Sequence, residues 1–161
     1  MKANTEIYNI PGRNVRMTEM SALLGRIQLE KLDDFLRQRR ALAHIYQVEL
    51  RGLDGVDVLI PNDIQSSSFW KVPIILDREI DREALTENMR SKGVSVDWAY
   101  NPPLHLQPVF ISLYQTFEGQ LPITEECLRR HICLPCHPRM ELDDALYVTR
   151  VLKQCLKHGV Q

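Results

Sequence analysis

One long amphipathic segment decides the fold class: residues 17–50 read MTEMSALLGRIQLEKLDDFLRQRRALAHIYQVEL. Its apolar side chains recur at spacings of three and four, which is the period of one helical face. No proline interrupts the segment, and Gly52 follows where a C-terminal glycine cap is expected. We therefore predict one helix of about 30 residues, about 45 Å long. The alternative is two helices with a break at residues 38–40.

The rest of the chain alternates strand and helix patterns. Short β-branched runs predict three strands, at residues 56–60, 68–76 and 94–98. Helical patterns predict three helices, at residues 82–91, 123–131 and 142–157. Asp81 and Gly93 are the expected caps of the first of these helices, and Pro73 confines its strand to a sheet edge or a bulge. The predicted fold class is α/β: a long N-terminal helix, a small, mainly antiparallel sheet and packed helices, in a single domain over residues 1–161.

Composition is that of an ordinary globular domain. The chain has 161 residues, 44% hydrophobic and 25% charged, with a net charge of −1. Such a balance gives no electrostatic reason to expect nucleic acid or an anionic membrane as partner. The apolar runs are strand-sized, far below a membrane span, and the polar N-terminus lacks the apolar stretch of a signal peptide. We expect a cytoplasmic protein whose four cysteines are reduced.

Three short stretches carry residues with chemical potential: GRNVRMTE at 12–19, YNPPLHLQP at 100–108 and CLPCHP at 133–138. From the residues alone, the first is a turn and helix cap, in which Arg16 or Glu19 pairs with neighbours. The second is a turn-rich crossover with His105 as a surface or core imidazole. The third satisfies the haem-attachment spacing C-x-x-C-H. Haem attachment, a zinc site and a thioredoxin-like pair stay open beside a purely structural role for the thiols.

Together the three stretches resemble the C-terminal half of a nucleotide-sugar aminotransferase of the DegT/StrS family, whose enzymes use pyridoxal phosphate (PLP). The resemblance implies a domain like the small domain of a fold-type I PLP enzyme. The first stretch matches the family pattern Gly-x-Asn-x-Arg-Met-(Ser/Thr)-Glu at the entry to a long helix. By resemblance, Asn14 hydrogen-bonds the PLP phosphate in the neighbouring subunit. Arg16 belongs to the same cofactor-binding loop, where it organises the loop or the dimer contact.

The other two stretches also have family counterparts. The second is similar to His-Tyr-x-Pro-x-x-His, so the resemblance implies that Tyr100 and His105 line the sugar pocket, with Ala99 in place of the first histidine. The third is similar to Ser-Leu-Pro-Leu-His-Pro, a strand and turn. Cys133 and Cys136 are then small apolar substitutes, and no metal site is expected.

The resemblance also bears on activity. Family enzymes hold PLP on a lysine of their N-terminal half, and no lysine here lies in a Ser-Phe-x-x-x-Lys context. We therefore expect no catalytic residue in this chain and no transamination or covalent PLP binding by the chain alone. The parent reaction would transfer an amino group from glutamate to a keto sugar of polysaccharide or antibiotic pathways; relatives with histidine for the lysine are dehydratases.

Partners follow from the same resemblance: a second copy in a homodimer, a missing N-terminal PLP domain, or both, and a nucleotide-sugar substrate. An expressed fragment, half of a split gene and a truncated reading frame all agree with the expected partial chain. The alternative function is a non-catalytic dimerisation or partner-binding module, and a cysteine metal or redox module is a third.

Overall fold

The computed structural model describes residues 16–158, so Gly12 and the predicted phosphate contact Asn14 lie outside the described residues. The chain divides into two units, residues 1–33 and 34–161. The prediction of a single domain stays a prediction. In the first unit, Thr18 caps α1 (Glu19–Leu29), and its Oγ1 accepts a hydrogen bond from the Ser21 amide at 3.2 Å. No side chain of α1 is buried, and Met20 and Leu29 are 68% and 67% exposed.

The predicted continuous helix is wrong. The segment forms α1 and α2 (Leu32–Glu49), separated by a turn at Glu30 and Lys31, and it is helical at residues 38–40, where the alternative placed the break. At the turn, the Lys31 amide donates to the Gln28 carbonyl at 3.1 Å, three residues back instead of four. This shortened bond is the usual way in which an α-helix tightens at its end. Apolar spacing alone carries no signal for it.

The second unit is a small sheet with helices on both sides. The strands are β1 (Val56–Val58), β2 (Val72–Leu76) and β3 (His131–Leu134), in the order β1-β2-β3, and both pairings are antiparallel. The predicted α/β class with a small antiparallel sheet is confirmed. The helices after β2 are α3 (Arg82–Ser91), α4 (Pro108–Tyr114), α5 (Pro122–Arg130) and α6 (Leu142–His158). Two 3₁₀ turns, η1 (Ile64–Ser66) and η2 (Leu104–Leu106), lie in loops.

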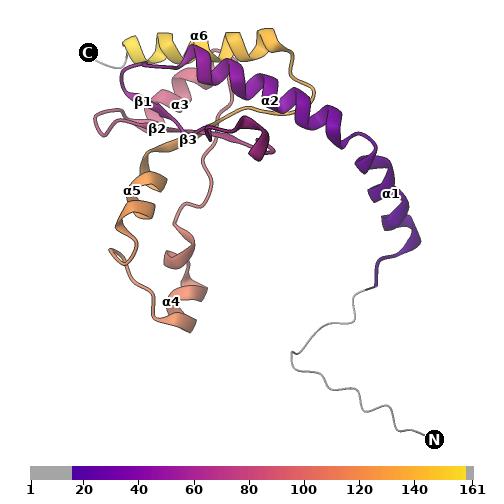
Figure 1. The fold of residues 1–161 in the computed structure, drawn as a ribbon. Helices are drawn as coiled ribbons and strands as arrows, with labels where there is room; N and C mark the ends of the chain where they lie inside the picture. The colour runs from indigo at the N-terminus through magenta and orange to yellow at the C-terminus, as the bar shows by residue number, and fades with distance from the viewer. Residues whose placement is uncertain (1–15, 159–161) are drawn as a thin grey trace, which may run out of the picture. The chain divides into compact units, whose positions relative to one another are not determined.

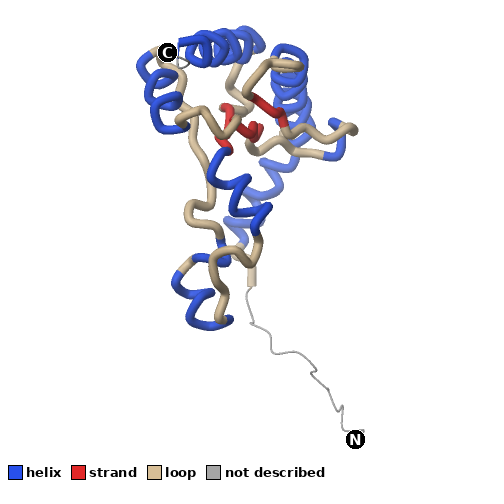
Figure 2. Tube along the Cα trace, turned by 90° about the vertical axis from the view of Figure 1, so that its left-hand side faces the viewer, coloured by secondary structure: helices blue, strands red, loops and turns tan. Residues whose placement is uncertain are grey.

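The main core lies between the sheet and the three helices α2, α3 and α6, which cover one face (Figure 1). Tyr46 of α2, Met89 of α3 and Leu152 of α6 are fully buried there with Ile74 and Ile132 of the sheet. The helices α4 and α5 lie on the other side of the strands, as the turned view also shows (Figure 2). This side carries the residues that the sequence placed in a pocket.

The strand β2 is central, so the prediction that Pro73 confines it to an edge or a bulge is wrong. The register explains why proline is tolerated. The Leu59 amide donates to the Pro73 carbonyl at 3.1 Å, which shows that the backbone groups of Pro73 face the β1 side. Because β1 ends at Val58, the amide that proline lacks would point beyond the regular ladder. Proline therefore removes an amide N–H at a position where no residue of β1 accepts a ladder hydrogen bond.

Several boundary signals are confirmed. Asp81 Oδ1 accepts from the Ala84 amide at 2.9 Å at the start of α3, and Gly93 has a positive φ of 78° at its end. The predicted strand at residues 94–98 is wrong, because the segment makes one isolated bridge, with the Cys133 amide donating to the Asp97 carbonyl at 2.7 Å. The helix α4 was not predicted from the sequence. In residues 16–158, no helix combines the length and apolarity that a membrane crossing requires.

Candidate functional site

The structure brings Tyr100 and His105 together at one surface hollow. The hollow has a volume of about 550 Å³ and lies among the loop after residue 99, α4 and α5. Its lining is mainly apolar and aromatic: Tyr100, Leu104, His105, Phe110, Tyr114, Thr116, Leu121, Thr124 and Leu128. Apolar walls with a few polar groups are typical of sites for small organic ligands.

Aromatic rings form one side of this hollow. Phe110 and Tyr114 lie one turn apart on α4, with ring centroids 5.9 Å apart and an interplanar angle of 23°. Tyr100 is 63% exposed and has a positive φ of 59°, an uncommon conformation for a bulky residue. Such conformations persist where the surrounding structure imposes them, and they gather at ligand sites. Tyr100 is therefore held by the backbone with its ring accessible to a ligand.

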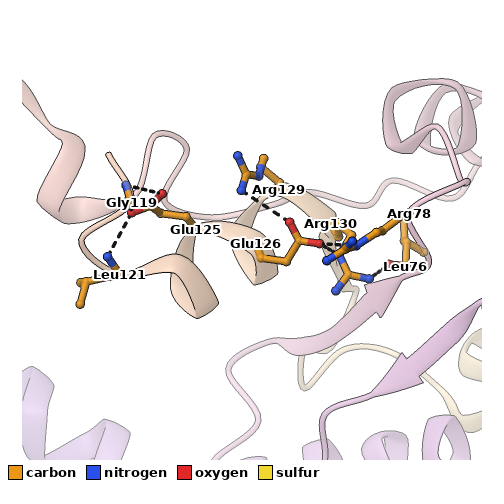
Figure 3. Close-up of polar contacts among 8 residues, drawn as sticks. All are labelled: Leu76, Arg78, Gly119, Leu121, Glu125, Glu126, Arg129 and Arg130. Atoms are coloured by element: carbon orange, nitrogen blue, oxygen red, sulfur yellow. Dashed lines mark hydrogen bonds and ion pairs between the residues drawn. The ribbon is translucent and has the colours of Figure 1, made fainter. Parts of the chain in front are cut away.

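His105 is held by a buried carboxylate that the sequence did not indicate. Its Nε2 lies 2.9 Å from Oε1 of Glu125, and the two side chains are only 9% and 6% exposed. Glu125 also accepts the backbone N–H groups of Gly119, at 2.9 Å to each oxygen, and of Leu121, at 3.2 Å (Figure 3). The hydroxyl of Thr116 donates to the His105 carbonyl at 2.5 Å.

These contacts decide the charge of Glu125. The hydrogen bond from His105 lowers the pKa of this carboxyl below its usual value, burial opposes that effect, and the backbone N–H groups of Gly119 and Leu121 lower the pKa further. A carboxylate that accepts several N–H donors is stable in its ionised form. Glu125 is thus a negative charge that faces one nitrogen of the His105 ring.

A second histidine fixes the start of the pocket loop. His131 Nε2 accepts the Ala99 amide at 3.0 Å, so that nitrogen carries no proton, and Nδ1 donates to the Leu128 carbonyl at 3.1 Å. Burial is the main cause that lowers the pKa of His131 and keeps the ring neutral. Arg82 donates to the same carbonyl at 3.0 Å, and its guanidinium lies 4.3 Å from the Trp98 ring centroid. Neither His131 nor Arg82 was predicted.

The next carboxylate on α5 points to different partners. Glu126 contacts Arg78 at 2.8 Å, Arg130 at 3.2 Å and Arg129 at 3.5 Å (Figure 3). Arg130 also donates to the Leu76 carbonyl at the end of β2, at 2.8 Å. These contacts attach the C-terminal end of α5 to the sheet, while Glu125 holds its beginning against the pocket loop.

The remaining predicted residues have separate outcomes. Asn14 lies outside the described residues, and Arg16 lies in the first unit, so its position relative to the hollow is not described. Cys133 and Cys136 are buried thiols whose pKa values are raised, chiefly by burial, that of Cys136 to about 11. A raised pKa opposes thiolate chemistry. Across residues 16–158 no group of three or more metal-ligating side chains is arranged around a common point.

The lysines of the described part do not fit a covalent cofactor anchor. Lys71 pairs with Asp97 at 2.6 Å and Lys153 with Glu49 at 2.9 Å, while Lys31, Lys92 and Lys157 are exposed. A lysine that forms a Schiff base works from a desolvated position with a free amine. No step through a PLP lysine is therefore assigned to residues 16–158.

Glu125 is the main functional candidate that sequence reasoning missed. The available signal was Pro122 at the first position of α5 followed by an acidic residue in the first turn, which predicts a carboxylate facing its own helix start. The contact with Leu121 agrees with that signal. The contact with His105, twenty residues away, depends on the tertiary fold.

Sequence and structure comparisons identify the known proteins that this chain resembles. The model of the DegT/DnrJ/EryC1/StrS aminotransferase family matches residues 1–153. GDP-perosamine synthase of Escherichia coli O157:H7 is 28% identical over 147 residues, which are 91% of this chain and 38% of that protein. The crystal structure of DesV from S. venezuelae, in complex with a ketimine intermediate, matches with a TM-score of 0.79 and 29% sequence identity. The match covers 91% of this chain and 38% of DesV.

A third similar protein was solved with the cofactor. It is the E. coli GDP-4-keto-6-deoxy-D-mannose-3-dehydratase with bound hydrated PLP, 25% identical with a TM-score of 0.74; the match covers 89% of this chain and 37% of that one. The chain thus spans about 40% of the length of the relatives that it matches.

Proposed function

Because the chain belongs to the DegT/DnrJ/EryC1/StrS aminotransferase family, we propose that it is the C-terminal part of a PLP-dependent nucleotide-sugar aminotransferase. In this proposal, the chain supplies the sugar pocket and a phosphate contact, and a separate part of the enzyme supplies the PLP lysine. The observation that carries the proposal is the shared hollow. Tyr100 and His105, which the resemblance assigns to the sugar, line one cavity of about 550 Å³ with aromatic side chains.

The residues of the hollow suit a sugar nucleotide. Sugar rings offer apolar C–H faces, which pack on aromatic side chains, and hydroxyl groups, which hydrogen-bond to a few polar groups. The Tyr100 ring is exposed, and His105 is held by its contact with Glu125. PLP, when bound to the whole enzyme, supplies the amino-group transfer. This chain's own residues bind and orient the substrate.

The cofactor contact rests on the family pattern alone. We assign Asn14 to the PLP phosphate, because an amide NH₂ donates to phosphate oxygens without adding charge. Arg16 belongs to the same loop. A homodimer would bring this loop to the active site of a second copy, as the resemblance implies.

Reconstitution tests this function. The chain is co-expressed with the polypeptide that carries the PLP lysine, and amino transfer from glutamate to a panel of nucleotide-linked 4-keto sugars is measured, with each polypeptide alone as control. The proposal predicts activity only when both are present. A folded complex of both parts that transfers no amino group to any of the sugars, or a chain that is active by itself, would contradict it.

One observation favours the second candidate, a partner-binding module. The apolar residues Met20, Leu24 and Leu29 of α1 are all more than half exposed, and exposed apolar groups of this kind are often covered by partners. Sedimentation at micromolar concentration separates the candidates when combined with the reconstitution. Self-association without activity in the reconstituted complex favours the module.

A further inference from the structure

The two nitrogens of the His105 ring are in different situations. Nε2 contacts Glu125, whereas Nδ1 makes no hydrogen bond within residues 16–158. In this part of the chain, the buried side-chain nitrogens that make no hydrogen bond are the Nε atoms of Arg39, Arg82 and Arg130. Nδ1 of His105 is not among them, so it is not sealed from solvent. The ring lines the hollow. Nδ1 is therefore the ring atom that remains for a ligand.

The other contacts of Glu125 decide where the ring proton lies. Backbone N–H groups only donate, and those of Gly119 and Leu121 point at the carboxylate oxygens. The carboxylate thus acts as an acceptor throughout, and His105 has to donate through Nε2–H. In the neutral ring the lone pair is then on Nδ1. Gly119 contributes through its positive φ of 89°, a conformation that other residues rarely adopt.

We propose that Glu125 is a positioning residue that holds the His105 ring with a proton on Nε2, so that Nδ1 accepts a hydrogen bond from a sugar hydroxyl in the hollow. This inference rests on the proposed function for its ligand, but the tautomer and its cause are properties of the chain itself. An acceptor at this place selects a hydroxyl donor over the terminal oxygens of a phosphate. Glu125 acts through His105 and does not need to touch the substrate.

Nuclear magnetic resonance of the full 161-residue chain, labelled with ¹⁵N in histidine, tests the tautomer at pH 8. His105→Gln assigns the signals. The wild-type ring should show the Nε2–H pattern and an Hε2 proton protected from solvent. Glu125→Leu should lose that protected proton. Glu125→Gln, which keeps the shape but not the charge, should exchange it about tenfold faster, because hydrogen bonds to charged groups are stronger than neutral ones.

Glu126→Gln is the matched control, since Glu126 is the neighbouring carboxylate and contacts arginines instead of His105. It should leave the Hε2 exchange rate unchanged. An Nδ1–H tautomer in the wild type, or unchanged Hε2 protection in a folded Glu125→Gln variant, would overturn the positioning role. Equal loss of protection in Glu126→Gln would also overturn it.

A second arm separates the positioning role from the proposed function. The labelled chain is titrated with dTDP-glucose and, separately, with dTDP. The proposal predicts that the ¹⁵N signal of His105 Nδ1 moves with dTDP-glucose only. If the tautomer is as stated but Nδ1 responds to neither probe, or equally to both, the assignment of the hollow to a sugar fails while the role of Glu125 stands.

Discussion

Replacing Tyr46 by phenylalanine removes one buried hydrogen bond and almost no apolar surface. Tyr46 of α2 is fully buried, and its hydroxyl donates to the Pro135 carbonyl at 2.8 Å, between the two cysteines of the CLPCHP stretch. A hydrogen bond contributes about 1 kcal/mol net, and a buried carbonyl left without a donor costs about 1–3 kcal/mol. Because Pro135 is half-buried and water reaches part of it, we expect a loss of about 1–2 kcal/mol in the free energy of unfolding.

Tyr147→Phe is the control for this substitution. Its hydroxyl donates to the Lys92 carbonyl at a similar 2.9 Å, but Tyr147 is 45% exposed. Water replaces the lost donor there, so the expected loss is below about 0.5 kcal/mol. Urea unfolding at pH 7 measures both variants, and an unchanged m-value shows that the comparison is valid. Equal losses for the two variants, or no loss for Tyr46→Phe, would refute the reasoning from burial.

Three further predictions concern the titratable groups. Cys133→Ser with Cys136→Leu should change stability by no more than about 1–2 kcal/mol. The double variant should also reduce the loss of stability as the pH rises from about 8.5 to 11, where unfolded thiols ionise but the raised pKa keeps Cys136 protonated in the fold. Wild type should lose stability as the pH falls below about 6.5, because the lowered pKa keeps folded His131 neutral while the unfolded ring takes up a proton; His131→Gln should flatten this dependence in urea titrations. Borohydride trapping with added PLP, followed by mass mapping, should find no stoichiometric adduct on a single lysine. One such adduct would contradict this prediction. A steeper acid dependence of stability in His131→Gln would contradict the prediction for His131.

The sequence predicted those parts of the fold that local chemistry decides. Asp81 and Gly93 bound α3 as predicted, because capping and positive φ are properties of single positions. The apolar stripe at residues 142–157 also predicted a helix, and the structure has α6 at Leu142–His158. Such signals need no knowledge of the rest of the molecule.

The parts that depend on tertiary contacts were not predictable in this way. Pro73 is tolerated in the central strand because β1 ends before it reaches Pro73. The residues next to Pro73 in the sequence do not indicate where β1 ends. The turn at Lys31 breaks the helix, although the apolar residues keep their helical spacing on both sides of it. Family resemblance pointed to Tyr100 and His105, and the structure places both at one hollow. The pairing of His105 with Glu125 required the fold of α5 against the pocket loop.

The most direct measurement of the central claim compares Asn14→Ala and His105→Ala in the reconstituted enzyme, titrated first with PLP and then with the sugar nucleotide. Asn14→Ala should weaken PLP binding by about 1.5–3 kcal/mol, because one hydrogen bond to a charged phosphate is lost. His105→Ala should retain PLP but bind and convert the sugar nucleotide poorly. Equal loss of PLP in both variants, or no change in either, would contradict the assignment of these residues to different ligands.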